Sequence, residues 1–201
     1  MESTIVKSGY AEQEILGSRF FGYAFPVSCR EEVERHLAEL GRRYPDATHI
    51  VYAFRIGEGG AQEHFTDAGE PSGTAGAPIM KFLHSREITN ILVAVVRYFG
   101  GTKLGTGGLV RAYSRTAQMA VEDAGIVPFV KMVEVEFAVP YSVISQIQNF
   151  VGSAGGDIIG QDFAEQVTIS AKIPEEKLPE LVEFVRNITR GSSEVHLKRG
   201  S

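Results

Sequence analysis

The chain has 201 residues but only one cysteine and no tryptophan, and it contains no long apolar run. Cys29 alone cannot form an internal disulfide or a cysteine-based metal site, and such sparse cysteine is typical of cytoplasmic proteins. No stretch reaches the roughly 18 consecutive apolar residues that indicate a membrane-spanning helix. The N-terminal segment also lacks the basic start and apolar run of a secretory signal. We therefore expect a cytoplasmic protein with no membrane partner.

Residue spacings typical of metal sites or catalytic sites are missing as well. The five histidines are scattered and form no H-x-x-x-H or H-E-x-x-H pattern. His64 lies three residues before Asp67 and could meet it, but no set of nucleophile, base and orienting residue is evident. We therefore predict no metal site, no cofactor and no catalytic residues.

Acidic residues are absent from one long segment, residues 88–121, although the chain as a whole has a net charge of −5. This segment contains four basic residues and carries a charge of +4, which leaves −9 for the rest of the chain. The overall negative charge does not favour binding to nucleic acid. The positive charge is instead concentrated around a glycine-rich stretch, in Arg97, Lys103, Arg111 and Arg115.

The first half of the chain, residues 1–128, reads as a mixed α and β domain. Residues 28–45 have a helical stripe, and Ser28 with Glu31 matches an S-x-x-E capping box. Residues 89–99 form a β-rich apolar run that predicts a buried central strand. The remaining expected elements are an extended stretch at 19–27, a strand at 48–57, its hairpin partner at 62–67 and a short helix at 77–85.

A further helix follows the glycine-rich stretch and ends at Gly125. At about 100° per residue its apolar side chains gather on one face, and Arg111 and Arg115 lie well away from it. The residues expected to pack are Val110, Tyr113, Ala117, Val121 and Ala124.

The second half, residues 129–201, reads as strand, helix, strand, strand, helix, strand. The two helices are expected at 141–156 and 174–191, each with a regular apolar stripe. This βαββαβ order predicts a ferredoxin-like domain.

The stretch "FGGTKLGTGGLVRAY" joins the central strand to the helix that follows. Its glycines let backbone N–H groups converge, and a helix N-terminus attracts anions. The run contains no G-x-x-x-x-G-K-[ST] motif, and Val110 occupies the third glycine position of G-x-G-x-x-G. Two interpretations remain open: an anion site, or a tight connection in which the glycines serve only the backbone.

The stretch "DAGEPSGTAGAP" is a second loop rich in turn residues. Asp67 and Glu70 could supply a carboxylate and Ser72 or Thr74 a hydroxyl for chemistry. The simpler interpretation is that Ser72 or Thr74 caps the helix that follows.

These two stretches together resemble the IMPACT family and its bacterial YigZ-type members in their two-domain form. The matching segments are "DAGEPSGTAGAPI" and "VVRYFGGTKLGTGGLVRAYSRTA", with "GSRFFGYAFPV" near the start. The resemblance implies an α+β chain: an N-terminal ribosomal protein S5 domain 2-like domain, with a sheet covered by helices on one face, then a ferredoxin-like domain similar to domain V of elongation factor G.

The resemblance also implies a link to translation. Eukaryotic relatives regulate translation during stress by competing for an activator of an initiation-factor kinase, through an additional N-terminal domain. This sequence begins close to the shared domain, so we do not expect that partner. The family has no agreed catalytic residues to transfer.

The two motifs define a predicted functional surface. Contacts to an anion or nucleic acid are expected from Arg97, Tyr98, Gly100, Gly101, Lys103, Gly105, Gly107, Gly108, Arg111 and Arg115. The second motif loop adds Asp67, Glu70, Pro71, Ser72, Gly73 and Thr74.

The leading hypothesis is a non-enzymatic regulator that binds RNA or ribosomes through this basic, glycine-rich surface, where Tyr98 or Phe99 could stack on a base. One alternative is an enzyme or binder of a small phosphorylated ligand, by analogy with kinases on the S5-like fold. Another is a protein-interaction module that uses the ferredoxin-like half.

Overall fold

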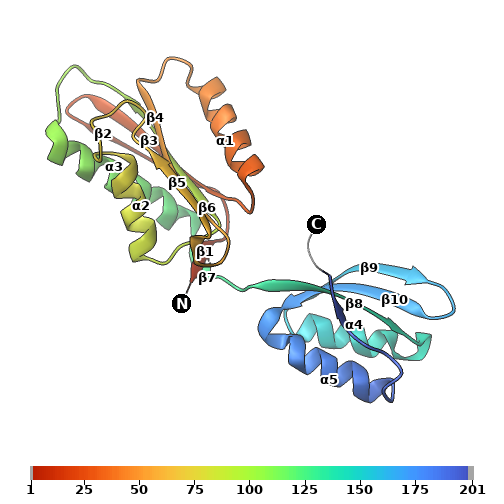
Figure 1. The fold of residues 1–201 in the computed structure, drawn as a ribbon. Helices are drawn as coiled ribbons and strands as arrows, with labels where there is room; N and C mark the ends of the chain where they lie inside the picture. Colours follow the sequence, from red (N-terminus) through yellow and green to blue (C-terminus); the bar gives the residue numbers. More distant parts are fainter. Residues whose placement is uncertain (1, 199–201) are drawn as a thin grey trace. The chain divides into compact units, whose positions relative to one another are not determined.

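A computed structural model describes residues 2–198 of the chain (Figure 1). The polypeptide divides into two compact units, and the division falls between Phe129 and Val130. Within the described residues, no helix is both long and apolar enough to cross a membrane.

The first unit is built on a five-stranded antiparallel sheet in the order β2-β3-β6-β4-β5. A short pair of strands, β1 and β7, lies apart from this sheet. The elements are β1 (Ser3–Ile5), β2 (Gly9–Ile15), β3 (Ser18–Pro26), α1 (Arg30–Arg43), β4 (His49–Ile56), η1 (Glu58–Gly60), β5 (Gln62–Thr66), α2 (Gly76–Ser85), β6 (Ile91–Tyr98), α3 (Gly105–Ala124) and β7 (Ile126–Pro128).

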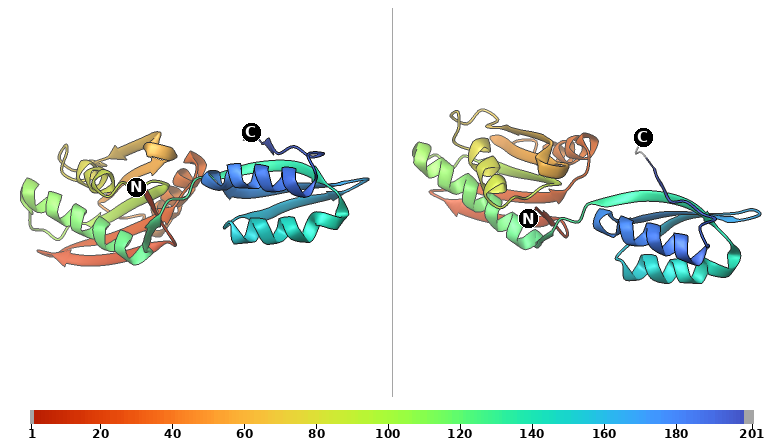
Figure 2. Two further views of the ribbon diagram at one scale, coloured as in Figure 1. Left: turned by 90° about the horizontal axis from the view of Figure 1, so that it is seen from below. Right: turned by 60° about the horizontal axis from the view of Figure 1, so that its bottom comes forward.

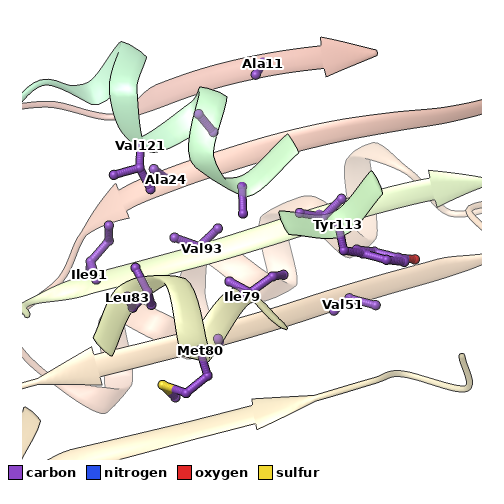
Figure 3. Close-up of a cluster of buried hydrophobic side chains, with 14 of the residues drawn as sticks. Ala11, Ala24, Val51, Ile79, Met80, Leu83, Ile91, Val93, Tyr113 and Val121 are labelled. Atoms are coloured by element: carbon purple, nitrogen blue, oxygen red, sulfur yellow. The ribbon is translucent and has the colours of Figure 1, made fainter. Parts of the chain in front are cut away.

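Strand β6 occupies the centre of this sheet, as its apolar run predicts. Alternate residues of β6 point to opposite faces. Ile91, Val93 and Val95 pack with α2 and α3, whereas Leu92 and Val96 pack on the side of α1. Figure 3 shows part of the first of these cores, where α2 and α3 pack on Val93.

The sheet therefore carries helices on both faces, and the expectation of helices on one face alone is wrong. The reason lies in β6, whose residues from Ile91 to Arg97 are all buried. A strand with apolar residues at successive positions needs cover on both sides. Helix α1 provides that cover through Val33 and Leu40.

The ends of α1 and α3 show how well local signals predict helix boundaries. The expected capping box of Ser28 and Glu31 is wrong by one residue, because Ser28 donates from its backbone N–H and its hydroxyl to Glu32. Helix α3 stops at Gly125, which has a positive φ of 72°, as predicted. Its buried face includes four of the five expected residues, and Val110 is only half-buried.

The second unit confirms the predicted βαββαβ order and the α+β class. Its sheet has the order β11-β8-β10-β9 with antiparallel neighbours, and α4 and α5 cover the same face (Figure 2). The elements are β8 (Met132–Val139), η2 (Tyr141–Val143), α4 (Ile144–Ser153), β9 (Asp157–Phe163), β10 (Val167–Pro174), η3 (Glu175–Lys177), α5 (Leu178–Ile188) and β11 (His196–Leu197).

Candidate functional site

The loop between β5 and α2 is organised by Asp67. Its Oδ1 accepts hydrogen bonds from the backbone N–H groups of Ala75 and Gly76, at 3.0 and 2.8 Å, and its Oδ2 accepts one from Gly73 at 2.7 Å. Burial alone would raise the pKa of Asp67, but these three N–H groups outweigh burial and hold the pKa below its ordinary value. Asp67 is thus an ionised anchor that caps the start of α2.

The prediction that Ser72 or Thr74 caps α2 is therefore wrong. Thr74 is buried, and its hydroxyl donates to the carbonyl oxygen of Pro71 at 2.6 Å, which tightens the loop. Ser72 is exposed. Asp67 replaces both as the cap because it can accept several N–H groups at once.

Glu70, three residues after Asp67, turns inward from the same loop. Its Oε1 accepts hydrogen bonds from Arg97 Nη1 at 2.5 Å and from the Tyr113 hydroxyl at 2.7 Å. The Glu70 and Arg97 side chains are only 3% and 5% exposed. Burial and this hydrogen bond raise the pKa of Tyr113 far above its ordinary value of 10, so the hydroxyl remains a donor. This buried cluster ties the second motif loop to β6 and α3.

Two further side chains complete the surroundings of the cluster. His49 Nε2 lies 3.8 Å from Glu70 Oε1, and its Nδ1 lies 2.8 Å from the carbonyl oxygen of Ala68. The Ser18 hydroxyl accepts hydrogen bonds from Arg97 Nη2, at 3.3 Å, and from the Gly100 backbone N–H, at 3.1 Å.

The guanidinium of Arg97 lies close to two aromatic rings. Its carbon Cζ is 5.4 Å from the centre of the Phe20 ring and 5.6 Å from that of Phe99. Among the described residues nothing accepts a hydrogen bond from its buried Nε. Arg97 therefore pairs with the Glu70 carboxylate and packs against Phe20 and Phe99, but its Nε–H has no acceptor among the described residues.

The glycine-rich connection crosses the β2–β3 turn at very short range. A Cβ at Gly100 would lie 1.9 Å from the carbonyl carbon of Gly17, so only glycine fits there. Gly101 and Gly105 have positive φ angles of 85° and 70°, which glycine adopts readily. A Cβ at Gly108 would lie 2.9 Å from Leu104 Cβ. The interpretation that these glycines serve the backbone is thus supported at several positions.

No side chain among residues 2–198 caps the start of helix α3. Leu104 occupies the capping position and has no side-chain hydrogen bond to the helix, and no acidic residue lies in the first turn. The leading N–H groups of such a helix carry partial positive charge. Lys103, directly before them, is exposed, and within residues 2–198 it has no ion-pair or hydrogen-bond partner.

A pocket of about 320 Å³ opens between the two motif loops, and we refer to it as the loop pocket. It combines apolar walls with the buried ion pair and the start of α3. Its lining residues are Glu70, Pro71, Arg97, Phe99, Lys103, Leu104, Gly105, Thr106 and Leu109. The two stretches singled out in the sequence thus meet in one place.

Some predicted site residues lie elsewhere. Tyr98 points to the opposite face of the sheet, where its hydroxyl donates to Asp46 at 2.9 Å and its ring packs near Tyr44. Its neighbour Phe99, which is 47% exposed, lines the pocket instead. Phe99 directly follows the last residue of β6, and successive residues of an extended chain point to opposite sides, so one aromatic faces the pocket and the other does not. Ser72, Gly73, Gly101 and Gly107 are exposed loop or helix-start positions outside the pocket lining.

Arg111 and Arg115 lie on the exposed side of α3, outside the loop pocket. A Cβ at Gly107 would lie 3.5 Å from Arg111 Nη1, so the Arg111 side chain reaches back over the first turn of the helix. Neither arginine has an ion-pair partner in the described part of the chain. Lys103, Arg111 and Arg115 together are called the basic surface below.

Ser18 and His49 are parts of this site that sequence reasoning did not select. Tyr113 was expected only to pack, although a buried tyrosine hydroxyl needs a partner and so could have pointed to Glu70. No comparable local signal marks Ser18 or His49, which reach the site through the pairing of β3 and β4 with β6. His64, for which contact with Asp67 was only one possibility, is exposed and lies beside the rings of Tyr52 and Phe54.

Metal ligands do not gather here. Across residues 2–198, no group of three or more histidine, cysteine or acidic side chains could hold a metal ion.

Comparison with protein families gives two matches. Residues 16–121 match the Impact N-terminal domain, and residues 137–192 match a domain of unknown function, DUF1949. The first match contains both motif loops and the whole loop pocket.

Several bacterial proteins resemble the chain over most of its length. It is 30% identical to the IMPACT family member YvyE of Bacillus subtilis, over 96% of this chain and 88% of that protein. It is 31% identical to the IMPACT family member YigZ of Escherichia coli, over 90% of this chain and 89% of that protein. A crystal structure of a hypothetical protein matches the whole of both chains with a TM-score of 0.71 and 29% identity. The human protein IMPACT is 31% identical to the chain over a shorter segment, which covers 44% of this chain and 28% of that protein.

Proposed function

The chain belongs to the IMPACT family, and we propose that it is a non-enzymatic, translation-associated regulator that binds RNA or ribosomes through the basic surface. The association with translation rests on the family. The chain shares only a minor part of the length of the mammalian relatives, so the proposal includes none of their partners.

The observation that carries this proposal is that three cations are exposed and unpaired within the described residues. Lys103, Arg111 and Arg115 are exposed and lack acidic partners among residues 2–198. Their positive charge is therefore available to phosphates, whose neutralisation supplies much of the affinity for nucleic acid.

Arg97 contributes to this surface only indirectly. Its charge is balanced by Glu70 at 2.5 Å, and its side chain is buried. The net positive charge of the pocket lining therefore comes from Lys103 and from the positive end of α3.

The test is binding of a ribosomal RNA fragment by filter binding, with co-sedimentation of ribosomes, at low salt. Lys103→Ala and Arg111→Ala should each weaken binding severalfold. Lys172→Ala removes an exposed lysine from the second unit and serves as the control for net charge. Equal binding by the wild type and both basic-surface variants would contradict the proposal.

A further inference from the structure

The lining of the loop pocket combines an exposed cation and a helix start with apolar side chains, and this combination suits a particular ligand. We propose that it holds one nucleoside 5′-monophosphate unit, with the phosphate at the start of α3 and the base against Phe99. The unit is either a free nucleotide or one unpaired nucleotide of a bound RNA strand. The RNA form of this proposal rests on the proposed function.

The phosphate end is formed by Lys103, Gly105 and Thr106. The backbone N–H groups of an uncapped helix start have no partner within the helix and bind phosphate oxygens well. Lys103 adds a full positive charge beside them, and the first turn of α3 contains no acid to oppose it.

Arg97 is a second cation in the wall of the loop pocket. This residue lines the pocket and is only 4% exposed, yet its Nε has no hydrogen-bond acceptor among the described residues. A buried donor without a partner costs free energy, so such groups are uncommon in folded proteins.

The base end is formed by apolar side chains. Phe99 is 47% exposed although it is large and apolar, and Pro71, Leu104 and Leu109 also line the pocket. The Arg97 guanidinium lies 5.6 Å from the centre of the Phe99 ring and holds one side of it. A flat aromatic base stacks on such a ring, as in single-stranded nucleic acid recognition.

The size of the pocket limits the ligand to a single unit. At about 320 Å³ it lies at the small end of the range for small-molecule sites. A duplex could not enter it, whereas one unstacked nucleotide presents a base, a sugar and a phosphate together.

The test measures binding of nucleoside 5′-monophosphates to the full chain by NMR titration of backbone amides. Parallel titrations use the matching nucleosides, inorganic phosphate and a short single-stranded RNA. We expect a monophosphate to shift the amides of Phe99, Lys103, Gly105 and Thr106, and to bind more tightly than a nucleoside or phosphate alone.

The variants separate the two ends. Phe99→Ala should weaken monophosphate binding about tenfold, whereas Phe99→Tyr, which keeps an aromatic ring, should bind almost as the wild type does. Lys172→Ala, which removes an exposed lysine of the second unit, should leave monophosphate binding unchanged.

The outcomes distinguish this proposal from the proposed function. RNA binding without any monophosphate binding, unchanged in Phe99→Ala, would overturn the pocket proposal and leave the proposed function standing. Monophosphate binding that is sensitive to Phe99, without RNA binding, would support a free nucleotide as ligand and contradict the RNA proposal. No binding of either probe would overturn both.

Discussion

Arg97 Nη1 lies 2.5 Å from Glu70 Oε1, and this ion pair joins strand β6 to the loop after β5 through two residues that are 27 apart in the sequence. Both side chains are almost fully buried. The pair brings the loop after β5 against the end of β6 and forms one side of the loop pocket. The shape of the candidate site therefore depends on a contact between charges rather than on the glycines alone.

Removing the cation of this pair should strongly destabilise the first unit. Arg97→Met leaves the Glu70 carboxylate buried without its charge partner, and breaking a buried ion pair in this way costs about 3–5 kcal/mol. Urea unfolding followed by tyrosine fluorescence measures this, because the chain has no tryptophan and six of its seven tyrosines lie in the first unit.

A double variant separates the ion pair from the packing around it. Glu70→Gln combined with Arg97→Met removes both charges, so the double variant should be less destabilised than the sum of the two single variants. Simple additivity would show that the two charges do not stabilise each other.

Tyr113→Phe should lower the stability of the first unit by about 1–3 kcal/mol, since it removes a buried hydrogen bond to a charged carboxylate. Tyr98→Phe is the matched control, because it removes an exposed hydrogen bond to Asp46. The control should change the urea midpoint little. Equal effects of the two variants would argue against a buried Tyr113–Glu70 contact.

Asp67 should make the stability of the first unit depend on pH. Its folded pKa lies below the ordinary value of 3.8, so its charge stabilises the fold fully above pH 3.8. This contribution is lost as the pH falls through the folded pKa. Asp67→Asn should therefore cost about 1 kcal/mol at neutral pH, a typical value for a helix cap, and progressively less below pH 3.8.

The measurement is urea unfolding of the wild type and Asp67→Asn at a series of pH values. Asp162→Asn, an exposed substitution in the second unit, is the control for the loss of one negative charge. If the difference in unfolding free energy between the wild type and Asp67→Asn grew as the pH fell, a lowered pKa of Asp67 in the folded protein would be contradicted.

Two glycine substitutions should have opposite effects. Gly100→Ala places a Cβ 1.9 Å from the backbone of Gly17, which forces the β2–β3 turn away and destabilises the unit by at least about 1–3 kcal/mol. Gly107→Ala meets nothing closer than 3.5 Å in the first turn of α3, so it should be neutral or stabilise by up to about 1 kcal/mol. Thermal unfolding of both variants compares them, and a strong loss in Gly107→Ala would contradict the structure.

Local sequence patterns predicted most elements of the fold. The apolar run of β6, the stripe of α3 with its stop at Gly125 and the alternation of elements in the second unit each depend on neighbouring residues, so they can be read without tertiary information. The position of α1 could not be read in this way. Only the pairing of β6 at the centre of the sheet shows that its second face needs a covering helix.

The site was predicted only in part for the same reason. The two glycine-rich stretches are recognisable as sequence, but their meeting depends on the buried contacts of Glu70, Arg97 and Tyr113. Arg97 appeared as one more basic residue, because its acidic partner lies in a different loop. Which of Tyr98 and Phe99 faces the site could be assigned only once the two faces of β6 were known.

The most direct test of the central claim is the salt dependence of RNA binding. For the wild type, the logarithm of the binding constant should fall linearly with the logarithm of the salt concentration. Each lost phosphate contact should reduce this slope by about 0.7–1, so Lys103→Ala combined with Arg111→Ala should reduce it by about 1.4–2. Lys172→Ala should keep the wild-type slope. If the double variant kept the wild-type slope and affinity, RNA would not bind at the basic surface.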